Sequence, residues 1–199
     1  LRVMVHVGDT CLDSCQAMAA SAEKAGAFAI SACAPYYFRP ANLDELVYYC
    51  AMISASAPTL PFYYYHVPEF TNVSVPIVRF LDEGPKRLPM LAGVIFASED
   101  LTDFGRCVDG FGKSMNLLLA RDDYMLAGMK MGAHGVVGSM CTYAAQLLLL
   151  IMQSFKAGDM GTAQNYQIKA VEMMAAMKRF GIIQASKAIM TEVGVKCGP

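Results

Sequence analysis

The feature that most constrains the fold is an alternation of short, β-rich apolar segments with longer segments of helical periodicity. Strands are predicted at 2–7, 28–34, 60–66, 91–96, 114–120 and 135–139, with helices between them at 12–25, 42–56, 76–83, 98–109 and 122–131. Near-continuous apolar strands that alternate with helices are typical of a parallel sheet covered by helices. Three further helices, at 142–156, 161–179 and 183–193, follow the last strand.

Local signals support several of these boundaries. Asn42 precedes a helix with two acidic residues in its first turn, which suits an N-cap and the helix dipole. Ser98 is a possible cap for the helix at 98–109, and Gly26 follows the first helix. Pro35 and Pro68 are expected to end the strands before them.

Two architectures fit this alternation. One is a doubly wound open sheet, and the other is a (βα)8 barrel that lacks some of its units. A whole barrel takes about 250 residues, whereas this chain has 199 residues. No Gly-x-Gly-x-x-Gly follows the first strand, so the dinucleotide-binding open sheet loses its main support. We expect one domain over 1–199, with the strands in 1–139 and a helical extension in 140–199.

Composition excludes several classes of protein. Apolar residues make up 55% of the chain and charged residues only 17%, which excludes a disordered chain. Sixteen basic and seventeen acidic residues form no basic stripe, so we expect no nucleic-acid partner. The longest apolar segment, 140–152, is too short for a membrane span, so we expect no membrane partner. The mean hydropathy of +0.36 indicates either an unusually buried interior or a surface that another chain covers.

The seven cysteines are scattered and include no Cys-x-x-Cys pair. This pattern indicates free thiols in a reducing compartment rather than disulfides or a zinc site. The amino terminus has no secretory signal pattern. We therefore expect a cytoplasmic protein without a bound metal.

Reactive groups in parallel α/β folds lie at the carboxyl ends of the strands. In this chain those ends carry His6, Gly8, Pro35, Tyr36, Tyr37, Tyr65, His66, Ile95, Ala97, Ser98, Ala120, Asp122, Asp123, Gly138 and Ser139. This set can line a small-molecule pocket, and it contains no lysine. Structural roles also account for single members: an aspartate can cap the helix at 122–131, and the histidines and strand tyrosines can belong to the core.

Several of these segments resemble the N-acetylneuraminate lyase group of class I aldolase barrels. The matching runs are His6-Val-Gly8, Leu60-Pro-Phe-Tyr-Tyr-Tyr-His-Val-Pro68, Asp100-Leu-Thr-Asp-Phe-Gly-Arg-Cys-Val-Asp109, Met131-Gly-Ala-His-Gly-Val-Val-Gly-Ser139 and Lys187-Ala-Ile-Met-Thr191. Their order and spacing hold over essentially the whole chain. The resemblance implies an incomplete TIM-type barrel of six βα units, with the first two units missing and a carboxyl-terminal helical extension.

The resemblance also implies a chemistry. The group cleaves N-acetylneuraminate to N-acetylmannosamine and pyruvate through a Schiff base on a lysine, without a cofactor or metal. It places the proton-transfer tyrosine at Tyr65 and the substrate contacts at Asp122, Asp123, Gly138 and Ser139, where Asp123 replaces the usual glutamate.

The departures from the group concern the reaction itself. Ile95 stands at the Schiff-base lysine position, and isoleucine cannot form an imine. Ala97 removes a hydroxyl expected nearby, and the loop that holds the substrate carboxylate would lie before residue 1. The alternative lysines Lys86, Lys113, Lys130 and Lys156 fall in predicted loops or helices rather than at a strand end.

Three functions remain open. The first is a lyase-like protein without aldolase activity that serves as a binding or structural component, with protein partners or self-association covering the open barrel edges. The second is an active N-acetylneuraminate lyase of which this sequence is one part. The third is a sensor that binds a sugar or keto acid without turnover.

Overall fold

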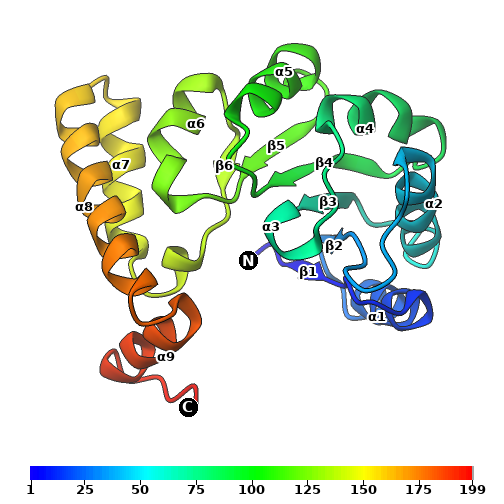
Figure 1. Cartoon of the computed structure of the whole chain (residues 1–199), viewed down its shortest axis with the longest axis horizontal. Helices are drawn as coiled ribbons and strands as arrows, with labels where there is room; N and C mark the ends of the chain where they lie inside the picture. Colours follow the sequence, from blue (N-terminus) through cyan, green and yellow to red (C-terminus); the bar gives the residue numbers. More distant parts are fainter. Residues whose placement is uncertain (199) are drawn as a thin grey trace. The chain divides into compact units, whose positions relative to one another are not determined.

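The computed structural model describes residues 1–198 and contains one six-stranded sheet. Its strands are β1 (Met4–His6), β2 (Ala29–Cys33), β3 (Phe62–His66), β4 (Leu91–Phe96), β5 (Asn116–Leu119) and β6 (Gly135–Val136). They neighbour one another in chain order, and β1 to β4 pair in parallel (Figure 1). A doubly wound sheet reverses its strand order at a switch point, whereas a barrel does not. The order therefore excludes the open-sheet alternative and confirms an incomplete barrel.

The helices follow the predicted alternation. They are α1 (Leu12–Lys24), α2 (Leu43–Ser54), α3 (Pro68–Thr71), α4 (Ile77–Glu83), α5 (Leu101–Phe111), α6 (Met125–Met131), α7 (Ala145–Lys156), α8 (Met160–Lys178) and α9 (Ile182–Glu192). Three 3-10 helices join them: η1 (Gly84–Lys86), η2 (Asp122–Tyr124) and η3 (Ser139–Thr142). Each predicted strand and helix is present, and most differ from the prediction by a few residues at their ends.

Two of the helix starts test the capping predictions. Asn42 caps α2 as expected, because its side-chain oxygen accepts from the Glu45 N–H at 2.9 Å. The Ser98 prediction is wrong, since Asp100 caps α5 by accepting from the Asp103 N–H at 3.0 Å. Ser98 accepts from the Asp100 N–H instead and so shapes the turn before the helix.

The connection between β3 and β4 differs from the prediction of a single helix. Pro68 ends the strand as expected, but it also begins the short helix α3, where its missing N–H costs nothing. Asn72 ends α3 with a positive φ of 53°, a conformation that asparagine tolerates better than most residues. β6 is likewise shorter than predicted: it ends at Val136, and residue 139, predicted as its last, begins η3.

The described residues form two compact units. The first comprises residues 1–118 and 132–134, and its core lies between β1 to β4 and the helices α1, α2, α4 and α5 (Figure 1). Tyr64 of β3 stacks on Phe80 of α4 with ring centroids 4.6 Å apart, and Phe96 of β4 meets Phe104 of α5 at 5.3 Å. Since side chains alternate across a strand, Tyr63 and Tyr65 point to the opposite face of the sheet.

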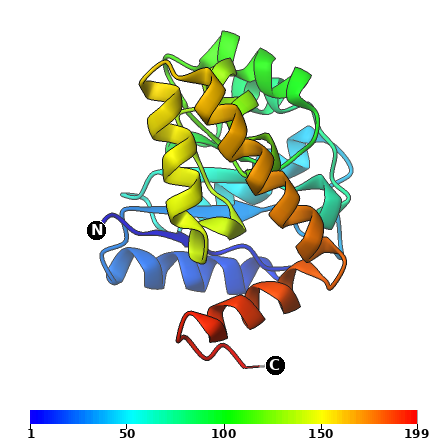
Figure 2. The same ribbon diagram turned by 90° about the vertical axis from the view of Figure 1, so that its left-hand side faces the viewer.

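The second unit comprises residues 119–131 and, among the described residues, 135–198, and it is mainly helical. Ala163, Gln167, Ala170, Met174 and Met177 recur every three or four residues and form the buried face of α8. That face packs along α7, and Figure 2 shows the two helices side by side, in yellow and orange. The alanines leave room for close approach, while methionines from α6, η3 and α8 fill the gaps in this core.

Two further properties concern the whole described chain. All seven cysteines are free thiols, four of them buried or half-buried and three exposed, namely Cys11, Cys141 and Cys197. Within residues 1–198, no helix is both long enough and apolar enough to cross a membrane.

Candidate ligand-binding site

Tyr65 and Ile95 lie side by side in the sheet. The register pairs Cys33 of β2 with Tyr65 of β3, and Tyr65 with Ile95 of β4, so these three side chains lie in a row on one face of the sheet. We call this row, centred on Tyr65 and Ile95, the β3–β4 row. The Ile95 side chain is only 3% exposed. The position that the resemblance assigns to a nucleophilic amine is therefore occupied by a buried aliphatic group.

His6 lies next to this row. Its ring meets the Tyr65 ring edge-on with centroids 5.7 Å apart, and its Nδ1 lies 3.2 Å from the Ser31 hydroxyl oxygen. Burial lowers the pKa of His6, which favours the neutral imidazole. The β3–β4 row and its surroundings thus supply a phenol, a thiol, an imidazole and a hydroxyl.

His66, another strand-end candidate, points away from Tyr65. Its ring packs against Phe96 at 5.3 Å, on the face that α4 and α5 cover, and its Nδ1 has no hydrogen-bond partner. Burial lowers the pKa of His66 to about 4. His66 is therefore a neutral core residue at physiological pH, which agrees with the structural alternative for the histidines.

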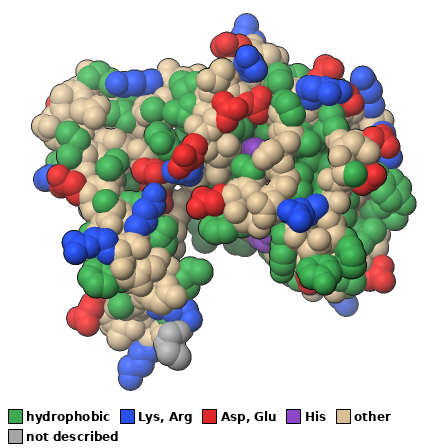
Figure 3. All heavy atoms as spheres, in the orientation of Figure 1, with side chains coloured by type: hydrophobic (Ala, Val, Ile, Leu, Met, Phe, Trp, Pro, Cys, Tyr) green, Lys and Arg blue, Asp and Glu red, His purple; other side chains and the backbone are tan. Residues whose placement is uncertain are grey.

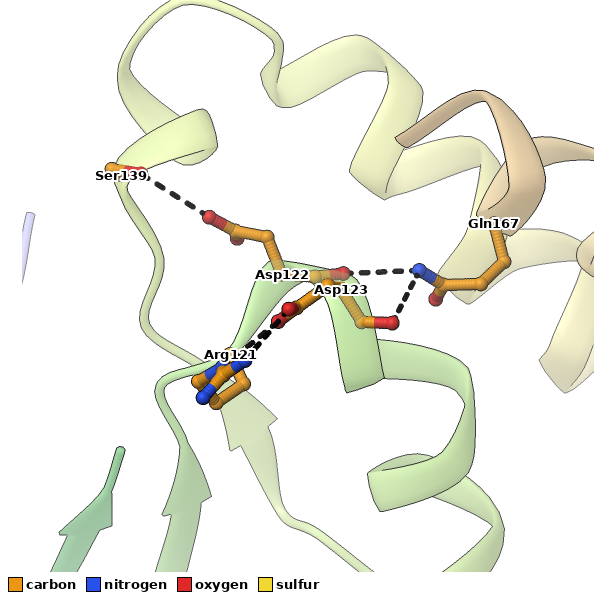
Figure 4. A network of polar contacts seen from close by, with 5 residues as sticks. All are labelled: Arg121, Asp122, Asp123, Ser139 and Gln167. Carbon is orange, nitrogen blue, oxygen red and sulfur yellow. Dashed lines mark hydrogen bonds and ion pairs between the residues drawn. The ribbon is translucent and has the colours of Figure 1, made fainter. Parts of the chain in front are cut away.

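The strand-end residues after β5 form a separate polar cluster, the Asp122 network, which consists of Arg121, Asp122, Asp123, Ser139 and Gln167 (Figure 4). Arg121 donates two hydrogen bonds to the Asp123 carboxylate, from Nε to Oδ1 at 2.9 Å and from a terminal nitrogen to Oδ2 at 2.7 Å. Burial would raise the pKa of Asp123, but the hydrogen bonds and charge of Arg121 outweigh it and lower that pKa.

Asp122 has the opposite environment. It is 4% exposed, and its Oδ2 accepts from the Met140 N–H at 3.1 Å and from the Ser139 hydroxyl at 3.4 Å. Burial is the larger influence and raises the pKa of Asp122. Gly138 is required at its position, because a Cβ there would overlap the Asp122 carboxylate.

Gln167 of α8 completes the network. Its side-chain nitrogen donates to the carbonyls of Asp122 at 3.0 Å and Asp123 at 3.2 Å, while its oxygen accepts from the Leu126 N–H at 2.9 Å. One buried amide therefore fixes η2 and the start of α6. Sequence reasoning missed Gln167, although a glutamine on the apolar face of a helix is the signal that could have found it.

A pocket of about 250 Å³ opens beside Ser139. We call it the Lys187 pocket, and its lining is Ser139, Thr142, Tyr143, Ile182, Ile183, Ser186, Lys187 and Met190. Lys187 belongs to a run that matches the lyase group, but it was not among the alternative lysines. Its place in α9, far from any strand in the sequence, is the reason that strand-end reasoning missed it.

The structure brings the predicted residues together in two groups. Tyr65 and Ile95 adjoin in the β3–β4 row, whereas Asp122, Asp123, Gly138 and Ser139 gather around η2 and η3. Of the latter four, only Ser139 lines the Lys187 pocket. In residues 1–198, no three His, Cys, Asp or Glu side chains are grouped so as to hold a metal ion.

These features can be compared with known proteins. A model described as the dihydrodipicolinate synthetase family matches residues 1–199. This chain belongs to that family. N-acetylneuraminate lyase of Mus musculus is 35% identical to it over 201 residues, which cover 100% of this chain and 63% of the mouse protein. This family member thus spans less than two-thirds of the length of that relative.

Solved structures agree with the assignment. N-acetylneuraminate lyase of Proteus mirabilis is 31% identical, with a TM-score of 0.94, and the match covers 100% of this family member and 67% of that chain. A sialic acid aldolase of Ruminococcus gnavus, solved as a catalytic lysine mutant, is 27% identical with a TM-score of 0.83, over 89% of this chain and 57% of that one. The resemblance to the N-acetylneuraminate lyase group is therefore confirmed.

Proposed function

We propose that this family member does not cleave carbon–carbon bonds through a lysine Schiff base and instead acts as a binding component of a larger assembly. The observation that carries this proposal is Ile95, buried beside Tyr65 where the lyase resemblance assigns the lysine. An isoleucine has no nitrogen to attack a keto group. The electron sink of the aldolase reaction therefore has no place to form.

The chemistry of the relatives supports this assignment. The Ruminococcus gnavus aldolase has a lysine that its structural description calls catalytic. Loss of a covalent nucleophile can cost several powers of ten in rate, even when the other groups remain. Tyr65 alone can move a proton, but it cannot stabilise the carbanion that forms on the keto-acid fragment when the aldehyde departs.

The Asp122 network supports retained binding. It keeps a buried carboxylate, a serine hydroxyl and a supporting amide in a hydrogen-bonded arrangement. A site that had lost both catalysis and binding would have no need for a buried carboxylate, which costs free energy to desolvate. A sugar or keto acid, the ligand class in the names of the lyase relatives, is the ligand that we assign to it.

The assembly part of the proposal rests on exposed apolar surface. Phe38, Phe70, Phe180 and Ile183 are each at least 70% exposed. Exposed apolar side chains of this size favour contact with another protein surface. A protein partner or a second copy of this chain would cover these surfaces. The free thiols support a reducing compartment, and the cytoplasm stays our prediction for it.

The proposal is tested by incubating the purified chain with pyruvate and sodium borohydride and then measuring its mass. A Proteus mirabilis N-acetylneuraminate lyase sample provides the positive control. We expect an adduct only in the control, and we expect no release of pyruvate from N-acetylneuraminate by the chain. A stable adduct on the chain, or pyruvate release, would support the alternative of an active lyase represented by part of its sequence.

The assembly part needs its own measurement. Light scattering during size-exclusion chromatography gives the mass of the chain in solution over a range of concentrations. We expect self-association or aggregation that rises with concentration when no partner is present. A strictly monomeric chain at high concentration would contradict the covered-surface argument.

A further inference from the structure

The space beside Gly8, in the first unit, is bordered by a thiol, an imidazole and a backbone amide. A Cβ on Gly8 would lie 2.8 Å from Nε2 of His6, 2.9 Å from the backbone nitrogen of Cys33 and 3.1 Å from the Sγ of Cys33. Any larger residue at position 8 would fill this space. The glycine therefore leaves the imidazole nitrogen and the sulfur next to a common gap at the carboxyl ends of β1 and β2.

His6 is oriented through its other ring nitrogen. Nδ1 lies 3.2 Å from the hydroxyl oxygen of Ser31, which is 3% exposed and pairs with His6 in the sheet register. With the Nδ1 proton donated to this oxygen, Nε2 presents its lone pair to the space beside Gly8. Desolvation lowers the pKa of His6, which favours this neutral form. His6 thus has the position and the protonation state of a general base.

Cys33 needs such a base. Burial raises the pKa of its thiol, so the sulfur keeps its proton at neutral pH. The backbone N–H of the same residue acts in the opposite direction, because it stabilises the thiolate. Cys33 is half-buried and His6 is exposed, so a small molecule can reach both. Figure 3 shows that histidine side chains, in purple, reach the molecular surface.

The fully buried thiols have different surroundings. The Cys15 sulfur lies 3.1 Å from the Tyr49 hydroxyl oxygen and accepts from the Asp9 N–H at 3.1 Å. Cys15, Cys50 and Cys107 are each at most 1% exposed, so a reagent in solution does not reach them. Cys33 is thus the half-buried thiol that combines access with a neighbouring imidazole.

We propose that Cys33 is a nucleophile that His6 activates, and that it accepts the acyl group of small esters or thioesters. Nε2 takes the proton from Sγ, and the sulfur attacks the carbonyl carbon to form a carbon–sulfur bond. The bond from that carbon to the leaving oxygen or sulfur then breaks, and His6 gives the proton to the leaving group. The Cys33 N–H stabilises the negative charge that develops on the carbonyl oxygen, and Ser31 is a positioning residue.

This reaction goes beyond the proposed function, because it uses a thiol and needs no lysine imine. Its test starts from a background variant in which the three exposed cysteines, Cys11, Cys141 and Cys197, are replaced by serine. The probe is p-nitrophenyl acetate, and timed peptide mass mapping gives the rate at which each residue is acetylated. We expect acetylation of Cys33 together with release of p-nitrophenolate, and we expect both to fall to the level of background hydrolysis in Cys33→Ala.

Substitution of His6 assigns the proton transfer. His6→Gln should slow the acetylation of Cys33 by about a hundredfold, because the general base is lost. His134→Gln is the matched control, since His134 is an exposed histidine of the same unit whose ring accepts from the Leu117 N–H. It should leave the rate unchanged.

Two further positions test the geometry. Ser31→Ala should slow acetylation by about tenfold, whereas Ser31→Thr keeps the hydroxyl and should restore the rate, which a purely structural role of Ser31 would not explain. Gly8→Ala places a methyl group in the gap and should block acetylation. Circular dichroism and urea unfolding report whether each variant is folded, and the His6 comparison concerns an exposed side chain and so does not depend on Gly8→Ala.

The inference is wrong if Cys33 stays unmodified in the background variant, or if His6→Gln reacts as fast as that background. Acetylation confined to lysines or to the amino terminus would contradict it equally. Borohydride trapping with pyruvate reports on a lysine imine instead. An adduct in that experiment would overturn the proposed function and leave the acetylation of Cys33 unaffected.

Discussion

The β3–β4 row and the Asp122 network both lie at strand ends but differ in what occupies them. In the β3–β4 row, Ile95, the position that the resemblance assigns to the reacting amine, is a buried aliphatic side chain. In the Asp122 network, Asp123 pairs with Arg121, Oδ2 of Asp122 accepts from the Met140 N–H while its Oδ1 is buried without a partner, and Gly138 leaves space for that carboxylate. The contrast teaches that the two groups of predicted site residues are carried by different strands, so a substitution in one group need not disturb the other.

The largest expected effect comes from restoring an amine to the β3–β4 row. Ile95→Lys should lower the free energy of unfolding by about 3 kcal/mol or more, because it buries an ionisable group in the sheet. It should also yield a borohydride-trapped pyruvate adduct at residue 95, which peptide mass mapping detects. Ile95→Met is the control and should yield none. Failure of Ile95→Lys to react while folded would mean that the geometry of the row does not suit imine formation even with an amine present.

The second effect concerns His66, which packs in the core on the face of the sheet opposite the β3–β4 row. His66 has a folded pKa of about 4 against about 6.5 in the unfolded chain. Neutral His66 therefore contributes stability that is present above pH 6.5 and lost as pH falls through 4, about 3 kcal/mol in all. His66→Phe should remove this loss in urea unfolding measured by near-ultraviolet circular dichroism across pH. Tyr64→Phe, which changes a neighbouring ring without a titrating group in that range, should keep it.

The third effect separates the two adjacent aspartates. The folded pKa of Asp122 is raised, so its contribution to stability is present below the unfolded value of about 3.9 and is lost as pH rises through the folded value. The folded pKa of Asp123 is lowered, so its contribution is present above about 3.9 and is lost as pH falls.

Asp123→Asn should cost about 1 kcal/mol at neutral pH, because its bond to Arg121 is partly exposed. Asp122→Asn should remove the fall in the free energy of unfolding that Asp122 causes as pH rises above about 4. Equal pH profiles for the two variants would contradict these environments.

The smallest effect concerns Ser139. Its hydrogen bond to Asp122 is long, at 3.4 Å, so Ser139→Ala should cost less than about 0.5 kcal/mol in urea unfolding. Asp122 would keep its bond from the Met140 N–H. A loss comparable to that of Asp123→Asn would mean that the hydroxyl supports the network more than its geometry indicates.

Much of this architecture could be predicted from the sequence, because the signals that start and end its strands and helices lie within a few residues of them. The strands are apolar runs bounded by proline, glycine or polar residues, and Asn42 caps α2 with a short side chain that acts within three residues. The sequence did not predict the short helix α3, because a proline such as Pro68 is equally compatible with the end of a strand and with the first turn of a helix.

The candidate site was less predictable because its contacts are distant in the sequence. Gln167 lies 45 residues after Asp122, whose carbonyl it binds, and nothing near either residue indicates the pair. Lys187 meets Ser139 in one pocket only because α9 follows the turn at Gly181. Strand-end reasoning identified Asp122 and Ser139 themselves, since the ends of neighbouring parallel strands converge whatever the helices do.

The exposed thiol of Cys141 has a practical consequence. It lies in η3 between Ser139 and Thr142, two residues that line the Lys187 pocket, while the other exposed cysteines lie near the chain ends. A fluorescent dye attached there, after Cys11 and Cys197 are replaced by serine, would sit at the rim of the cavity. Its emission would give an optical readout of occupancy, suited to screening a library of small molecules without any enzymatic assay.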